Sequence, residues 1–327
     1  MSEGTKVKLA ESIATSELFQ PESELTLFPL VPVRVQTNFD SKAFLLIRAK
    51  ALDHSRLPLG VTAADIVAEQ FPPLAGWEWK KQVPAAWLGV WSPAYQASRK
   101  MKAAILGAIA LTQPVQYRYM FSMREVFGGR CTCGTSATTS FMAEHTPPMM
   151  HDIAISDSDH EWLSIVAGIL EENDKATRRQ LRALEYFYRA WPLGPPERFP
   201  ILCMALDALF GEVAHATQAV IDKVRGVLGD HISENRLRRL MDVRASVIHG
   251  GAPDVYDSRK YARYYSRYEI DPIRDMELVV AASLRAGIFK GRMQEHPAPD
   301  AELLAQLRAA GRLPELSIDR TILSSNS

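Results

Sequence analysis

The sequence predicts a mixed α and β N-terminal domain followed by an all-α helical bundle. Residues 25–127 mix strand-like alternation with short helical segments, whereas helical periodicity begins after residue 157 and continues to about residue 307. The length of 327 residues also exceeds that of a usual single domain. We therefore expect an α+β domain over residues 1–157, the bundle over 158–310 and a disordered tail over 311–327.

Strands and helices alternate in the N-terminal half. Apolar residues alternate over 25–36, and Pro29 and Pro32 make this segment an expected edge strand, because proline cannot donate to a sheet ladder. The other expected elements of this half are a strand at 42–48, a helix from Thr62 to Pro72, a strand-like segment at 76–91, a helix at 95–111 and a strand at 116–127.

The second half reads as consecutive helices. Asp159 can cap a first helix that carries Trp162 and Val166 on one face. Pro195 or Pro196 can occupy the first turn of a later helix, where its missing N–H is not needed. The helices expected after the first run over 175–191, 195–211, 217–228, 234–249, 259–268 and 273–289.

Composition narrows the class of protein. No N-terminal signal peptide and no apolar run of about 20 residues are evident, so we expect a cytoplasmic protein without a membrane span. Three cysteines are too few for a disulfide framework. The formal net charge is zero, which argues against nonspecific coating of nucleic acid, but residues 223–267 hold ten Lys or Arg and five Asp or Glu, hence 10 − 5 = +5. An anion site is therefore expected in that stretch.

Arg244 and His249 are the candidate catalytic residues within this basic stretch. Histidine can donate and accept a proton near neutral pH, and arginine can bind two phosphate oxygens at once. Positions five apart lie about 140° from each other on a straight helix. Gly250 and Gly251 allow the helix to end at His249, so that the imidazole can turn toward the arginine. The pair indicates chemistry on a phosphodiester.

The order of motifs from about Arg182 to Phe289 carries a family resemblance. ALEYFYRAW, ALDALFG, DKVRGVL and RLMDVRASVIHGG follow one another, and the segment resembles the Apea-like branch of the HEPN superfamily, whose signature is Arg-x4-His followed by glycine. The resemblance implies a HEPN-type bundle that forms a homodimer, with the motif residues of both protomers in one cleft. It also implies metal-independent RNA cleavage without a cofactor, in a toxin or antiviral-defence role.

The resemblance also implies a mechanism. The 2′-hydroxyl of the RNA would attack the adjacent phosphorus, leaving a 2′,3′-cyclic phosphate and a 5′-hydroxyl. His249 would transfer the proton, and Arg244 would bind the phosphate. Three positions depart from the family pattern: Ala245 replaces a polar residue, Asp207 replaces a glutamate, and Met241 with Asp242 replaces a frequent tyrosine-containing pair.

Other interpretations of the motif remain open. Arg244 could form a structural salt bridge with Asp207 or Asp242, and the bundle would then be a non-catalytic module that binds RNA, a nucleotide or a protein partner. The N-terminal domain could recognise a trigger or regulator, or could itself hold the main activity while the bundle dimerises. Retention of both Arg244 and His249 favours the nuclease.

Two further groups of residues are candidates for binding. Tyrosines at 261, 264, 265 and 268 share helical spacing with cations. They predict a buried stripe, a surface that stacks bases, or both at once. The candidate RNA-binding cations are Arg225, Arg239, Lys260, Arg263 and Arg267. A weaker alternative is a zinc site, whose four ligands would be Cys131, Cys133, His145 and His151. One residue between the two cysteines is poor zinc spacing, so we expect loop thiols and no metal.

Overall fold

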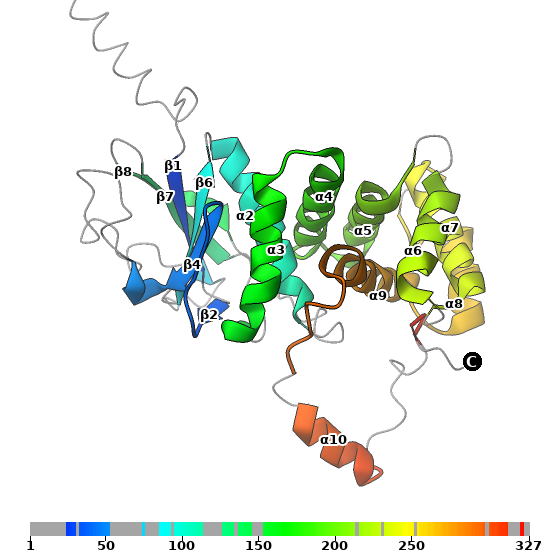
Figure 1. Ribbon diagram of the computed structural model, residues 1–327. Coiled ribbons are helices and arrows are strands. Elements are labelled where there is room, and N and C mark those ends of the chain that lie inside the picture. The colour runs from blue at the N-terminus through cyan, green and yellow to red at the C-terminus, as the bar shows by residue number, and fades with distance from the viewer. Residues whose placement is uncertain are drawn as a thin grey trace, which may run out of the picture. The chain divides into compact units, whose positions relative to one another are not determined.

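A computed structural model describes most of the chain: residues 24–30, 33–52, 74–75, 85–92, 95–113, 126–133, 137–145, 153–212, 216–229, 232–251, 254–297, 301–312 and 321–323. The chain forms two compact units (Figure 1). The first comprises residues 1–102, 124–148 and 152–171, and the second comprises 103–123, 149–151 and 172–327. Among the described residues, no helix is both long and apolar enough to cross a bilayer.

The first unit is built on an antiparallel sheet in the order β3-β4-β6-β1-β7-β5, with β8 paired to β7. A separate parallel pair joins β2 to β9. The strands are β1 (Glu24–Leu30), β2 (Val33–Val35), β3 (Phe39–Asp40), β4 (Phe44–Arg48), β5 (Leu74–Ala75), β6 (Ala86–Ser92), β7 (Val126–Cys133), β8 (Ala137–His145) and β9 (Ile153–Ile155). Leu25, Leu27, Leu45, Ile47, Trp87 and Cys131 form one buried cluster of this unit.

The prediction that residues 25–36 form an edge strand is wrong. β1 lies inside the sheet, because it pairs with β6 along its whole length and with β7 on its other side. Pro29 is tolerated there because β7 pairs only with Leu25–Leu27, so the ladder on that side ends before the proline. The alternation continues past the prolines, but the chain starts a new strand, β2, that belongs to a different sheet.

Helix α3 (His160–Glu171) belongs with the sheet unit, so the division between the units differs from the expected boundary after residue 157. A 3₁₀ turn (Asp157–Asp159) precedes α3. Asp159 accepts hydrogen bonds from the Ser156 N–H at 2.9 Å and from the Trp162 indole N–H at 2.9 Å. It is therefore part of a capping box one turn before the helix, with Ser156 as the N-cap.

In the second unit, the described residues from 172 onward form helices and the connections between them. Its helices are α4 (Lys175–Ala190), α5 (Pro195–Phe210), α6 (Ala216–Leu228), α7 (Glu234–Ile248), α8 (Arg259–Tyr268), α9 (Pro272–Leu284) with a π-helical turn (Arg285–Phe289), and α10 (Ala301–Ala309). The predicted helices from α4 to α9 agree with these bounds within one residue, apart from the π-helical end. Helix α2 (Tyr95–Leu111), also expected, contributes its part from Ala103 onward.

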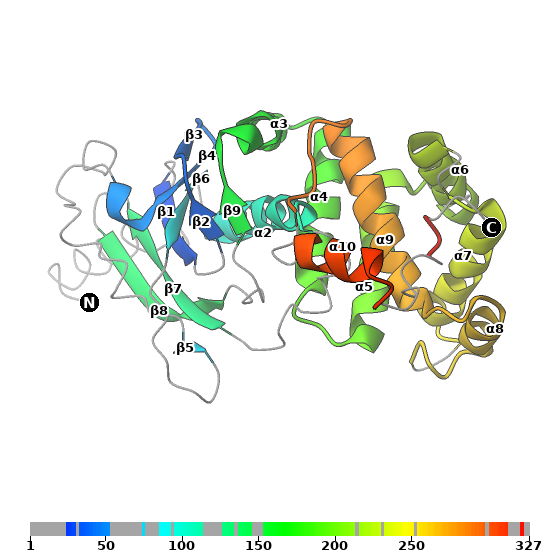
Figure 2. The ribbon, with the colours of Figure 1, turned by 90° about the horizontal axis from the view of Figure 1, so that it is seen from below.

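Helix α9 runs through the middle of the helical elements in Figure 2, and α5 packs against it. α5 contacts α4, α6, α7 and α9, and α9 also contacts α6, α7 and α8. Gly107 of α2 lets that helix approach α4, since a Cβ at Gly107 would lie 2.2 Å from the Leu184 carbonyl oxygen. Buried ion pairs join the elements: Arg198 of α5 pairs with Glu277 of α9 at 2.7 Å.

Asp275 of α9 is the centre of a second buried network. Its carboxylate is fully buried and accepts hydrogen bonds from Arg236 Nε at 2.6 Å and from the Tyr264 hydroxyl. The Ile322 N–H donates to its other oxygen at 3.1 Å, and Ile322 is 1% exposed. Residues 321–323 are thus held against α9, which differs from the disordered tail expected over 311–327. The expected helix at 62–72 and strand at 116–127 lie outside the described residues, apart from Val126 and Phe127 at the start of β7.

Candidate functional site

The glycines after the motif helix form a defined C-terminal cap. Gly250 has φ +72°, a conformation that favours glycine, and its N–H donates to the Val247 carbonyl at 3.2 Å. The Gly251 N–H donates to the Ser246 carbonyl at 2.8 Å, and a Cβ at Gly251 would lie 2.9 Å from that oxygen. These two bonds make a Schellman motif, which ends α7 with His249 as its C-cap.

Arg244 is buried against the neighbouring helices. Its side chain is 6% exposed, and Nη2 lies 2.5 Å from Oδ2 of Asp207 on α5. Nη1 donates to the hydroxyl of Thr217 on α6 at 3.3 Å. Of the two carboxylates considered as partners, Asp207 therefore makes the ion pair, and Asp242 is exposed on α7. Arg244 ties the motif helix to α5 and α6.

This ion pair retains unused hydrogen-bonding capacity. Asp207 Oδ1 and Arg244 Nε are buried and have no hydrogen-bond partner among the described residues. Nearby on α5, burial raises the pKa of the Cys203 thiol, while the charge of Arg244 acts in the opposite direction. Because burial dominates, Cys203 stays a neutral thiol and is a poor nucleophile.

His249 has a different environment from Arg244. It is exposed, and within the described chain its imidazole makes no hydrogen bond or ion pair. No hydrogen bond joins it to Arg244, whose guanidinium faces α5 and α6. A hydrogen bond of 2.9 Å between Ser258 and Ser246 fixes the end of α7 to the start of α8. A single chain thus presents the imidazole to solvent and keeps the guanidinium inside.

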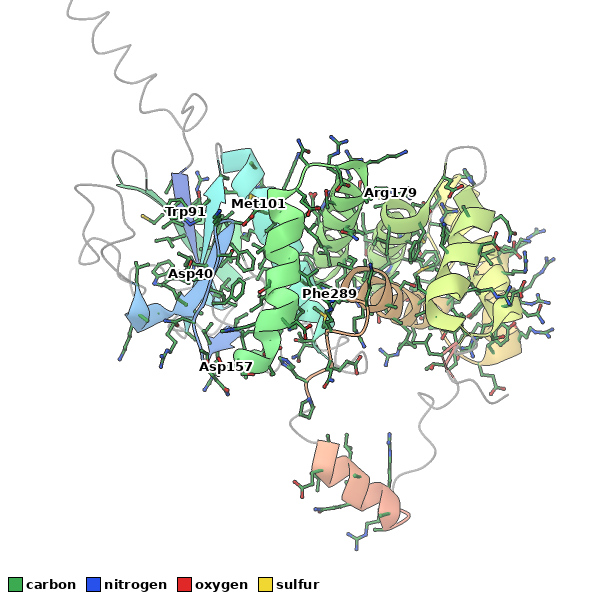
Figure 3. The ribbon with its side chains drawn as sticks, viewed as in Figure 1. Asp40, Trp91, Met101, Asp157, Arg179 and Phe289 are labelled. Atoms are coloured by element: carbon green, nitrogen blue, oxygen red, sulfur yellow. The ribbon has the colours of Figure 1, made fainter. Side chains whose placement is uncertain are left out.

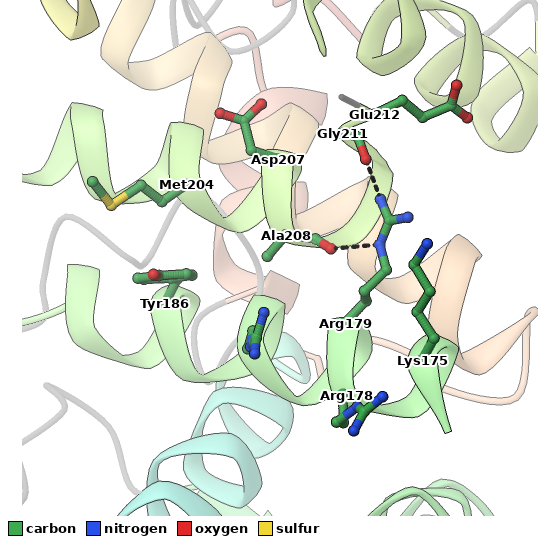
Figure 4. Close-up of a pocket in the computed structure, with 10 residues that line it drawn as sticks. Lys175, Arg178, Arg179, Tyr186, Met204, Asp207, Ala208, Gly211 and Glu212 are labelled. Atoms are coloured by element: carbon green, nitrogen blue, oxygen red, sulfur yellow. Dashed lines mark hydrogen bonds between the residues drawn. The ribbon is translucent and has the colours of Figure 1, made fainter. Parts of the chain in front are cut away.

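A basic cleft lies between α4 and α5, and its cavity volume is about 750 Å³ (Figure 4). Its lining residues are Lys175, Arg178, Arg179, Arg182, Tyr186, Met204, Asp207, Ala208, Gly211 and Glu212. Arg179 reaches from α4 to α5, where Nε donates to the Ala208 carbonyl at 3.0 Å and Nη2 to the Gly211 carbonyl at 2.6 Å (Figures 3 and 4). Asp207 therefore belongs both to this cleft and to the ion pair with Arg244.

The cations predicted to bind RNA are all exposed, but they differ in their partners. Arg225 pairs with Glu234 at 2.8 Å, so its charge is already offset. Arg267 lies with its guanidinium 5.8 Å from the ring centre of Tyr268. The remaining cations, Arg239, Lys260 and Arg263, are exposed without a side-chain partner among the described residues.

The tyrosines of α8 differ in their burial. Tyr264 is 1% exposed and belongs to the Asp275 network. Tyr265 is 50% exposed, and its ring is nearly parallel to that of Tyr261, with 6.3 Å between centres. Burial raises the pKa of Tyr261 to about 12, and the Asp271 carboxylate adds to this shift. One side of the helix is therefore core, and the other presents aromatic rings beside cations.

Of the four residues of the zinc alternative, the described part of the structure includes the side chain of Cys131. Cys131 is buried in the core of the sheet. The side chains of Cys133, His145 and His151 lie outside the described part of the structure. Among the residues that are described, no group of three or more His, Cys, Asp or Glu could hold a metal ion.

The four cations of α4 were not singled out from the sequence. Lys175, Arg178, Arg179 and Arg182 follow the spacing i, i+3, i+4, i+7, which places them on one face of a helix. This spacing is the feature of the sequence that could have identified the four cations.

Comparison of the chain with protein-family models, curated proteins and solved structures finds no match. Conclusions about activity therefore depend on the site itself and on the motif.

Proposed function

We propose that this protein is a metal-independent endoribonuclease of HEPN type, acting as a toxin or antiviral-defence effector. One observation carries the proposal. The capped end of α7 presents the His249 imidazole to solvent, and the imidazole has no partner in the described chain. Arg244, on the same helix, is buried and pairs with Asp207 of α5. A fixed helix with an exposed, unengaged imidazole at its end suits proton transfer to and from RNA.

The proposed reaction needs two proton-transfer groups. A base removes the proton from the 2′-hydroxyl, the 2′-oxygen bonds to phosphorus, and the bond from phosphorus to the 5′-oxygen breaks. An acid then protonates the departing 5′-oxygen, which leaves a 2′,3′-cyclic phosphate and a 5′-hydroxyl. Because one chain offers one His249, a homodimer with two α7 ends in one cleft would supply both groups. Arg244, the second catalytic candidate, would bind the phosphate in this proposal, and within one chain it is held by Asp207.

A second function is favoured by the state of Arg244. Its guanidinium is buried and neutralised by Asp207, so it would have to leave that pair to bind phosphate. A non-catalytic module that binds RNA through exposed cations such as Arg263 and Arg267 does not require this movement. The two functions share RNA as the partner and differ in whether His249 acts on it.

The deciding experiment is incubation of purified protein with total RNA in EDTA. We expect cleavage by the wild type and a loss of about 10²-fold or more in His249→Ala, the scale for removal of a general acid or base. Asp242→Ala, an exposed change on the same helix, is the matched control and should retain activity. End-group analysis should find 2′,3′-cyclic phosphate. RNA that is bound but not cleaved would support the non-catalytic module.

Dimerisation has its own measurement. Light scattering at micromolar concentration should give twice the chain mass of 36.5 kDa. A strictly monomeric protein that still cleaves RNA would contradict the shared site. Mixing His249→Ala protomers with a second inactive variant that retains His249 then tests whether both imidazoles are needed in one dimer.

A further inference from the structure

The cleft between α4 and α5 contains an ordered row of positive charge. Lys175, Arg178 and Arg182 are exposed, and Arg179 is half-buried. From Lys175 to Arg182 the row rises about 10 Å along the helix axis, at 1.5 Å per residue. A row of this length, on one helix face and in a cavity of about 750 Å³, fits several linked negative charges better than one.

Most of this charge is not offset by the protein. Lys175 and Arg182 make no hydrogen bond or ion pair with the described residues. Arg178 contributes to lowering the pKa of Asp174, for which backbone hydrogen bonds from Thr177 and Ala176 are the main cause. Arg179 is fixed by two carbonyls of the α5 end, which carry no formal charge that could offset the guanidinium. The cleft therefore presents four cations, and the two carboxylates in its lining are Asp207, which pairs with Arg244, and Glu212.

The two ends of the cleft differ. Tyr186 and Met204 lie together at one end, and Glu212 lies at the other, beyond Arg179 (Figure 4). An aromatic ring and a thioether favour a flat heterocycle, whereas a carboxylate repels a further phosphate. A continuous phosphate backbone would have to pass Glu212, and a short ligand would not. The volume also lies within the range of roughly 300–1,000 Å³ that is usual for small-molecule sites.

We infer that this cleft binds a nucleoside triphosphate, with its phosphates along the α4 cations and its base against Tyr186 and Met204. The proposal is independent of RNA cleavage, because none of its ligand contacts involves His249. Asp207 lies on the wall of the cleft and pairs with Arg244, so an occupied cleft adjoins the motif helix through one carboxylate.

Calorimetric titration tests the site, with ATP and inorganic tripolyphosphate as probes in buffer that contains EDTA. We expect both to bind the wild type. The double variant Arg178→Glu with Arg182→Glu should weaken both by at least about 10-fold. Arg308→Glu, an exposed change on α10, makes a reversal of the same kind outside the cleft and should leave both affinities within about twofold.

A second variant separates the base from the phosphates. Tyr186→Leu should weaken ATP by about 5-fold or more, the scale of lost stacking, and should leave tripolyphosphate unchanged. Failure of ATP to bind the wild type at millimolar concentration would overturn the proposal, as would equal affinities in the double variant and Arg308→Glu. Tighter binding of a single-stranded oligoribonucleotide that ATP cannot displace, lost in the double variant, would make the cleft an RNA groove instead.

Discussion

Arg244 of α7 and Asp207 of α5 form an ion pair of 2.5 Å, although 37 residues separate them along the chain. The Arg244 side chain is 6% exposed, whereas the Asp207 side chain is 32% exposed and lines the basic cleft. The pair therefore links the helix of the motif to a cleft that the motif does not include. Its strength can be measured from either partner.

Removing the carboxylate should destabilise the protein. Asp207→Asn leaves Arg244 buried without a counter-charge, and we expect a loss of roughly 3 kcal/mol in the free energy of unfolding, the low end for such pairs because Asp207 is partly exposed. Denaturant titration measures this loss. Asp242→Asn, on the exposed face of α7, should change stability by less than about 0.5 kcal/mol. Equal effects of the two changes would show that the pair contributes nothing.

Arg244→Lys should be nearly as damaging to RNA cleavage as Arg244→Ala. Arginine reaches Asp207 and Thr217 with two separate nitrogens, and a lysine ammonium lacks the planar fork that spans both. Initial rates on one RNA substrate, together with melting temperatures, give the comparison. Full activity in Arg244→Lys would mean that charge alone is required at this position.

The exposed face of α8 should contribute to RNA affinity through phosphate contacts. If Arg263 and Arg267 each bind one phosphate, replacing both with alanine should reduce the slope of log affinity against log salt by about 1.4 for single-stranded RNA. Arg225→Ala is the control, because Glu234 already offsets that charge, and its slope should stay close to the wild-type value. An unchanged slope with a lower melting temperature would remove α8 from the binding surface.

Buried and exposed ion pairs on α7 should differ in energy. Asp275→Asn leaves Arg236 buried without its counter-charge, and we expect a loss of about 3–5 kcal/mol in the free energy of unfolding. Glu234→Gln breaks exposed pairs with Arg225 and Arg238 and should cost less than about 1 kcal/mol. Chemical denaturation of both variants in one buffer checks the contrast, and similar losses would contradict it.

Alkaline pH should reveal the environment of Tyr261. Its pKa is raised to about 12 by burial, from roughly 10 in an unfolded chain. A raised pKa means that its contribution to stability is complete below pH 10 and is lost as the pH rises to about 12. The stability difference between wild type and Tyr261→Phe should therefore change across this interval. Denaturation midpoints at pH 9 and pH 12 measure it, and a constant difference would contradict the shift.

The helical half was predictable because its signals are local. Pro195 or Pro196 at a first turn and Gly250 after α7 each mark an end, and the structure places those ends within one residue of the predicted ones. Strand position was less predictable. Whether Pro29 lies at an edge depends on how far β7 extends along β1, and no local pattern in β1 encodes the length of its neighbour.

The candidate site was predictable only in part, for the same reason. Asp242 could have been excluded as a partner of Arg244, since residues two apart lie on different faces of a helix. Choosing Asp207 required the packing of α5 against α7. The α4 cations have regular spacing, but such a row is usually a solvated face, and only the approach of the α5 end makes it one wall of a cleft. In the proposed homodimer, the approach of two α7 ends would depend on the assembly and not on one chain.

The contact between Ile322 and Asp275 has a practical consequence for anyone who expresses this protein. A chain shortened after Arg312 would lack the peptide N–H that reaches Asp275 Oδ1, and it would also lose the Ile322 carbonyl that accepts from Ser233 at 3.4 Å. The shortened protein would thus lose two bonds to the start of α7 and to α9 without any change in the helices themselves. An affinity tag attached after Ser327 would leave both bonds in place. Trimming the tail to aid crystallisation would remove Ile322 and would weaken the domain that carries the motif.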